Sequence, residues 1–223
     1  MTNQLRLIFL ICFLSLSAQA ASSNASFGII GAYNSFTSTN FTLTQTGVNL
    51  NETPGTASGY GGGIVGVFPI GSGTLSLEAR ALYISEGTST STSGTISSLT
   101  TTGTVTATVP YIEIPILLDI SVSPNFIFQF GGFYNSPVGN ISTTQNLVVG
   151  GSSQNSTSSS TNTANDYGVT GGVEFILNPT STTRLFISAD YLYGLGNLNS
   201  GTAGATTSAS RVIQGSVGLL FPL

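Results

Sequence analysis

The 223-residue chain carries four Lys and Arg residues against eight Asp and Glu residues, so only 5% of it is charged and its formal net charge is −4. So few cations cannot form the basic patch that nucleic acids require, and no nucleic-acid partner is expected. Soluble domains are about 25% charged, which makes an ordinary water-exposed surface a poor fit to this composition.

The first twenty residues have the pattern of a secretory signal peptide. Arg6 precedes an apolar run from Leu7 to Leu16, and the segment closes on Ser17-Ala18-Gln19-Ala20. A basic start, a short hydrophobic stretch and a small-residue ending predict cleavage after Ala20. We therefore expect a cleaved signal peptide at 1–20, which removes Cys12, and one mature barrel domain at 21–223.

Apolar and aromatic segments recur along the mature chain, separated by connections that alternate between short and long. Strands are expected near 26–39, 58–70, 74–86, 105–122, 125–138, 166–177, 183–197 and 211–223. The short links near 71–73, 123–125 and 178–182 contain Gly, Pro and Asn, which favour tight turns. The long polar links cover roughly 40–57, 87–104, 139–165 and 199–210. This rhythm is typical of outer-membrane barrels, which have short periplasmic turns and long external loops.

Side-chain character alternates with a period of two, which indicates strands. Between 75 and 83 the odd positions hold Leu, Ala or Tyr, whereas the even positions include Ser76, Glu78 and Arg80. Similar alternation occurs at 112–120, 169–177 and 184–193. After the signal there is no run of about 20 apolar residues that could cross a bilayer as a helix. We therefore predict an all-β fold, a closed antiparallel up-and-down transmembrane β-barrel of about eight strands, in contact with outer-membrane lipid.

Tyrosines fall near the predicted external strand ends, where an aromatic belt meets the membrane surface. They are Tyr83, Tyr111, Tyr134, Tyr167, Tyr191 and Tyr193. An alternative interpretation is that tyrosine simply favours strands. The closing strand, 211–223, resembles the C-terminal strand of outer-membrane proteins, although it ends on Phe221-Pro222-Leu223 rather than on an aromatic residue.

The segment from Tyr111 to Leu118, Tyr-Ile-Glu-Ile-Pro-Ile-Leu-Leu, resembles a mid-barrel strand of the PorT-like outer-membrane β-barrel families. The hairpin layout is also similar to that of the small OmpA/OmpX-like barrels. The resemblance implies a small barrel in the bacterial outer membrane and supplies no catalytic residue.

Catalysis is not expected. The sequence has no histidine, and its one cysteine lies in the predicted signal. The Ser-His-acid and Cys-His arrangements therefore cannot be built, and the nitrogen and sulfur ligands that zinc prefers are missing. We predict neither catalytic, cofactor-binding nor metal-binding residues.

Ionisable side chains on the polar faces are expected to point into the barrel lumen and to form a candidate polar network. Its members are Glu78, Arg80, Glu113, Asp119, Glu174 and Asp190. One interpretation is a structural network that plugs the barrel, because buried carboxylates need partners. The other is that one arginine cannot neutralise five acids, so that water and cations enter or some acids stay protonated.

The leading functional prediction is a non-enzymatic outer-membrane barrel with a structural or surface-interaction role. Its long loops, including the uncharged stretch 140–165, would meet an external ligand or a cell-surface partner. A first alternative is a narrow cation-preferring pore for ions or very small solutes. A second is a soluble secreted β-sandwich binding module, which would need more charge on its water-facing surfaces.

Overall fold

The computed structural model describes residues 25–38, 48–71, 74–96, 99–161, 165–195 and 210–223. The predicted signal peptide at 1–20 lies outside these ranges. In the described residues no helix is long and apolar enough to cross a membrane. The strands are β1 Ser26–Ser38, β2 Val48–Ile70, β3 Leu75–Ile96, β4 Leu99–Ser123, β5 Phe126–Pro137, β6 Asn140–Val149, β7 Ser152–Thr161, β8 Asp166–Ile176, β9 Arg184–Gly194 and β10 Ser210–Pro222.

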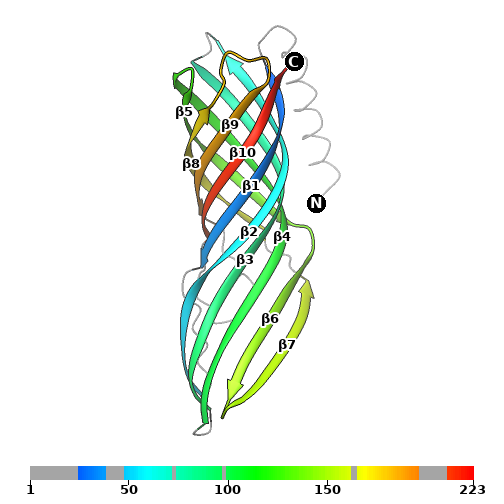
Figure 1. The fold of residues 1–223 in the computed structure, drawn as a ribbon, viewed down its shortest axis with the longest axis vertical. Coiled ribbons are helices and arrows are strands. Elements are labelled where there is room, and N and C mark those ends of the chain that lie inside the picture. The colour runs from blue at the N-terminus through cyan, green and yellow to red at the C-terminus, as the bar shows by residue number, and fades with distance from the viewer. Residues whose placement is uncertain (1–24, 39–47, 72–73, 97–98, 162–164, 196–209) are drawn as a thin grey trace.

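Eight of these strands close into a ring (Figure 1). The order around it is β1, β2, β3, β4, β5, β8, β9 and β10, and every neighbouring pair is antiparallel. The first and last strands seal it, since Ser26 lies opposite Pro222 and Ser38 lies opposite Ser210. The predicted closed antiparallel barrel of about eight strands is confirmed. The β-sandwich alternative is wrong, because a ring without an open edge is not two separate sheets.

The faces of the barrel strands follow the predicted alternation. In β3 the side chains of Ser76, Glu78 and Arg80 are buried in the lumen, whereas Leu75 and Tyr83 are exposed on the outside. The same pattern runs through β8, β9 and β10. Because successive side chains of a strand point to opposite faces, a single polar or apolar position fixes the orientation of its neighbours.

Five of the six belt tyrosines are exposed on the outer face, from 38% for Tyr134 to 56% for Tyr83. Tyr111 is the exception: it is only 7% exposed and points into the lumen. Its placement in the belt was wrong, because Tyr111 and Glu113 are two residues apart in β4 and therefore share the inward face. The two outward tyrosines that the prediction omitted, Tyr33 and Tyr60, are 55% and 78% exposed.

Three predicted loops are largely strand, which corrects the sequence-based expectation. β2, β3 and β4 continue beyond the barrel, and the hairpin of β6 and β7 joins them through β4, from Thr101 opposite Val149 to Thr108 opposite Ser142. We call this five-stranded part, made of 48–57, 87–96, 99–108, β6 and β7, the protruding sheet. It extends from the barrel end opposite the C-terminus (Figure 1). The predicted loop at 199–210 lies outside the described residues except for Ser210.

Polar strands of this kind escape hydrophobic-periodicity arguments. The protruding sheet is rich in Thr, which is β-branched and fits an extended backbone, but it has too few apolar side chains to give a continuous apolar period of two. Main-chain pairing with the strands that rise from the barrel holds it instead. A tight turn at Gly150 and Gly151, with φ of 56° and 87°, closes the β6–β7 hairpin, and glycine adopts such angles without steric cost.

Candidate functional site

The polar network of the lumen is built from neighbouring barrel strands. Alternation in β3 points the even-numbered Glu78 and Arg80 inward. In β4 the odd-numbered positions face inward, among them Glu113 and Asp119. β8 and β9 contribute Glu174 and Asp190. All six side chains belong to residues that are at most 3% exposed.

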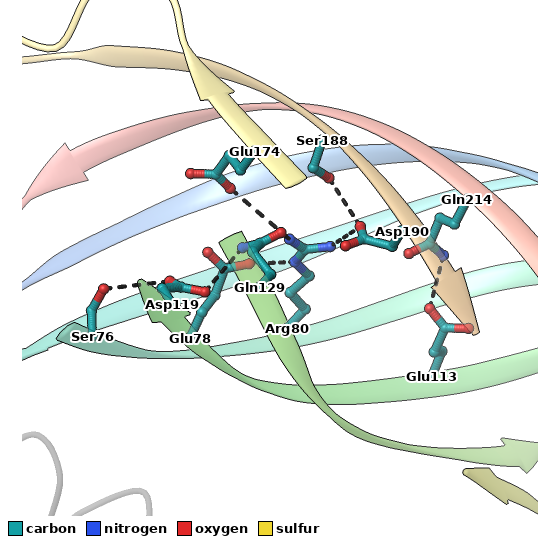
Figure 2. A network of polar contacts seen from close by, with 10 residues as sticks. All are labelled: Ser76, Glu78, Arg80, Glu113, Asp119, Gln129, Glu174, Ser188, Asp190 and Gln214. Atoms are coloured by element: carbon teal, nitrogen blue, oxygen red, sulfur yellow. Dashed lines mark hydrogen bonds and ion pairs between the residues drawn. The ribbon is translucent and has the colours of Figure 1, made fainter. Parts of the chain in front are cut away.

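Arg80 is the centre of the network (Figure 2). Its Nη1 lies 2.8 Å from Oδ2 of Asp190, and its Nε donates to Oε1 of Glu78. Its Nη2 donates to Oε1 of Gln129 over 2.9 Å and lies 4.0 Å from Oε2 of Glu174. The guanidinium thus contacts three carboxylates and one amide. Its planar set of N–H donors can bind several acceptors at once.

Asp119 joins this network indirectly. Gln129 accepts from Arg80 and donates through its Nε2 to Oδ1 of Asp119 over 3.1 Å. Ser76 donates to the other oxygen of Asp119 over 3.4 Å, and Ser188 donates to Asp190 over 3.1 Å. Four of the other predicted residues are therefore linked to Arg80: Glu78, Glu174 and Asp190 directly, and Asp119 through Gln129.

Glu113 stands apart from that cluster. It accepts a hydrogen bond from Nε2 of Gln214 over 2.8 Å, as Figure 2 shows at some remove from Arg80. On the neighbouring strands it lies opposite Asn135, which in turn lies opposite Asp166. Asn135 donates to Glu86 over 3.3 Å. Glu113 therefore belongs to a second polar cluster, nearer to the protruding sheet.

Several members of these two clusters were missed in the sequence. Gln129 faces Asp119 across β4 and β5, and Gln214 lies between outward-facing Ile213 and Gly215 in β10. Both follow from strand parity, so the signal was present. The predicted network consisted of ionisable residues alone, and these two uncharged amides were therefore not part of it. Glu86 and Asp166 were overlooked because they lie at the ends of predicted strands.

The lumen carries a large excess of acidic groups. Seven of the eight Asp and Glu residues of the sequence are buried: Glu78, Glu86, Glu113, Asp119, Asp166, Glu174 and Asp190. Within the described ranges Arg80 is the one buried cation. Among the described side chains, Oε2 of Glu78, Oε2 of Glu113 and Oδ1 of Asp190 have no hydrogen-bond partner. An isolated buried carboxylate is costly, so this excess must be compensated by protons, water or cations.

A metal centre is not among the arrangements found. In the described part of the chain no three His, Cys, Asp or Glu side chains are placed so that they could hold a metal ion.

The protruding sheet is the second candidate site. Residues 87–112 and 138–165 contain no Asp, Glu, Lys or Arg, and the sheet is dominated by Ser, Thr, Asn and Gly. Every residue of β7 is exposed, whereas β6 alternates between exposed and half-buried positions. Apart from Glu52 in the first of its strands, the sheet therefore offers hydroxyls, amides and main-chain groups rather than charge.

Comparison with known proteins identifies the family. The family of the outer membrane protein beta-barrel domain matches residues 17–200, most of the chain. The chain belongs to this family. It is accordingly a bacterial outer-membrane β-barrel protein, as the sequence predicted. No curated protein matches the chain.

Solved outer-membrane barrels are similar in structure but not in sequence. Ail, the attachment invasion locus protein of Yersinia pestis, is 10% identical with a TM-score of 0.40, over 89% of this chain and 99% of that one. OprG from Pseudomonas aeruginosa is 12% identical with a TM-score of 0.43, over 90% and 97%. Neisserial surface protein A is 16% identical with a TM-score of 0.39, over 87% and 97%.

Membership of this family orients the molecule. Outer-membrane barrels turn their short connections to the periplasm and their long ones to the outside. The short β2–β3, β4–β5 and β8–β9 links lie at the barrel end near the C-terminus, and the protruding sheet lies at the other end (Figure 1). The protruding sheet therefore lies outside the cell, and the outward apolar residues of the barrel contact lipid.

Proposed function

We propose that this outer-membrane barrel is a non-enzymatic surface-interaction protein, in which the barrel is the anchor and the protruding sheet makes the contacts. The observation that carries the proposal is the continuation of β2, β3 and β4 beyond the barrel as paired strands. Ten residues of strand span roughly 30 Å, so the sheet stands well clear of the lipid. A mere connection between barrel strands needs no such ordered surface.

The filled lumen supports the anchoring role. Large buried side chains, among them Arg80, Phe186 and Leu82, occupy the interior together with the polar network. Side chains fill the interior of a small eight-stranded barrel, which makes it a rigid body rather than a conduit. A rigid barrel holds the strands that leave it in fixed register. The proposal therefore treats the Arg80 network as a structural plug.

Catalysis has no part in this proposal. The sequence lacks histidine, and the carboxyl groups of Asp190, Asp119 and Glu113 accept hydrogen bonds from Arg80, Gln129 and Gln214 inside the lumen. A general acid or base must reach its substrate, which these buried groups do not.

Removal of the β6–β7 hairpin tests the proposal. Residues 140–161 are replaced by a short Gly-Ser turn, and the full and shortened chains are produced in a Gram-negative host that lacks the protein. Heat-modifiable mobility on gels confirms that both chains form barrels. Retention of cells on glass, on matrix-coated surfaces and on other bacteria is then counted. We expect retention on at least one of these with the full chain and a fall to the vector level without the hairpin. Equal retention of full-chain and vector cells on all of them would refute the proposal.

A second candidate function is a narrow cation-preferring path, and the excess of buried acids favours it. Seven buried acids against one arginine would attract cations and repel anions from the lumen. Single-channel recording of the purified barrel in planar bilayers decides this candidate. Cation-selective steps would support it, and either silence or anion preference would exclude it.

A further inference from the structure

We propose that β7 is a self-recognition edge, which pairs antiparallel with β7 of a second copy of this chain on a facing membrane. The inference rests on the proposed surface-interaction function and names the partner. It follows from an asymmetry between the two edges of the protruding sheet.

The β7 edge lacks the features that normally prevent an edge strand from pairing with another chain. Among the described strands β7 pairs only with β6, in unbroken register from Asn140 opposite Thr161 to Val149 opposite Ser152. The strand has ten residues, all of them exposed, with neither proline nor charge. Edge strands usually carry a charge, a proline or a bulge that prevents pairing with another chain. β7 has none of these.

The opposite edge of the same sheet has features that prevent pairing with another chain. There β2 pairs only with β3 among the described strands, from Val48 to Gly55. That stretch contains Glu52 and Pro54, and its register with β3 shifts between Gly55 and Gly61. Proline has no amide hydrogen to donate, and a bulge twists an edge away from a new partner. The sheet is therefore blocked at β2 and open at β7.

Main-chain geometry fixes which groups β7 offers. The two-residue turn at Gly150 and Gly151 makes Val149 and Ser152 a hydrogen-bonded pair. The amides of alternate residues then point to β6, and those of Ser153, Thr157 and the other odd-numbered residues point to the free side. A second strand can add to this side without disturbing the β6–β7 ladder.

A copy of β7 fits this edge. In an antiparallel pair, two opposite residues direct their main-chain N–H and C=O groups either both toward the partner strand or both away from it. One register that satisfies this rule places Thr157 opposite Thr157 of the copy. Ser153 then lies opposite Thr161, and Asn155 lies opposite Ser159. Each pair joins hydroxyl or amide side chains, which stabilise neighbouring strands, and no like charges meet. β7 has no aromatic or apolar side chain that would fill the pocket of an unrelated partner.

The membrane decides where the copy must lie. β7 runs along the barrel rather than across it (Figure 1). All barrels of one membrane point the same way, so their β7 strands run in the same direction. Antiparallel pairing brings together strands of opposite direction, as on two facing membranes. The pairing therefore joins cells, and many weak contacts act together across the junction.

Charge exchange at the self-paired position tests the proposal. Thr157→Lys and Thr157→Glu are made in the full chain and produced in separate host populations with different fluorescent labels. Like charges face each other in either variant alone, and opposite charges face each other in the mixture. We expect unaltered cells to clump, each variant population to stay dispersed, and the mixture of the two to clump again. Ser93→Lys, at an exposed site on the interior strand β3, is the matched control and should clump like the unaltered chain.

The outcomes separate this inference from the proposed function. Heat-modifiable mobility and surface labelling verify that every variant folds and reaches the surface. Clumping of the Thr157→Lys cells by themselves, or a mixture that stays dispersed, would overturn the self-recognition edge. Unaltered cells that do not clump would also overturn it. Hairpin-dependent retention on another surface would in those cases leave the surface-interaction function standing.

Discussion

Replacement of Arg80 by methionine is expected to destabilise the barrel strongly. Arg80 is 2% exposed, and its guanidinium donates to Glu78, Asp190 and Gln129, with distances of 2.8 Å to Asp190 and 2.9 Å to Gln129. Methionine fills much of the same volume but leaves these acceptors without a donor and the carboxylates without a counter-charge. Removal of one partner from a buried ionic network costs roughly 3 to 5 kcal/mol. We expect a loss of that size in the free energy of unfolding.

Urea unfolding of the purified barrel in lipid vesicles, followed by heat-modifiable mobility, measures this loss. Arg211→Met is the matched control, because Arg211 is exposed and lies 5.9 Å from the centre of the Tyr193 ring. An exposed cation–π contact contributes only about 0.5 to 1 kcal/mol. An Arg80→Met barrel as stable as Arg211→Met would refute the central role of Arg80.

Three further predictions concern packing, the second polar cluster and the edge. Gly63→Ala should hinder barrel formation, because a Cβ there would collide with the backbone of β3, whereas Gly215→Ala has open space; gel mobility after refolding compares them. Gln214→Leu removes the donor to Glu113 and should lower the unfolding free energy by about 1 to 3 kcal/mol in the same urea assay. Thr157→Pro should abolish clumping without loss of the β6–β7 hairpin, because its amide points to the free side; Thr157→Val should still clump, and hairpin integrity is checked by protease resistance.

The amino-acid sequence alone was enough to predict most of the barrel strands and which of their faces is polar. The alternation around Glu78 and Arg80 established which face is polar, and the short links established where strands reverse. These are local properties, because strand parity and turn chemistry depend on residues that are near neighbours in sequence. Tyr111 is a case in which this parity was not applied. It lies two positions from the inward-facing Glu113, so strand alternation already predicts that it points into the lumen.

Only the tertiary structure decided which inward groups meet and what the polar segments become. Arg80 and Asp190 are 110 positions apart, and their 2.8 Å contact depends on the register of every strand between them around the ring. That Glu113 binds Gln214 rather than Arg80 is set in the same way. Residues 140–161 are mostly polar, apart from Ile141 and the run 147–149, and carry little strand signal of their own. They form a hairpin because β4 offers them an edge beyond the end of the barrel. Side-chain direction is local, whereas the pairing of strands is fixed by the closure of the sheet.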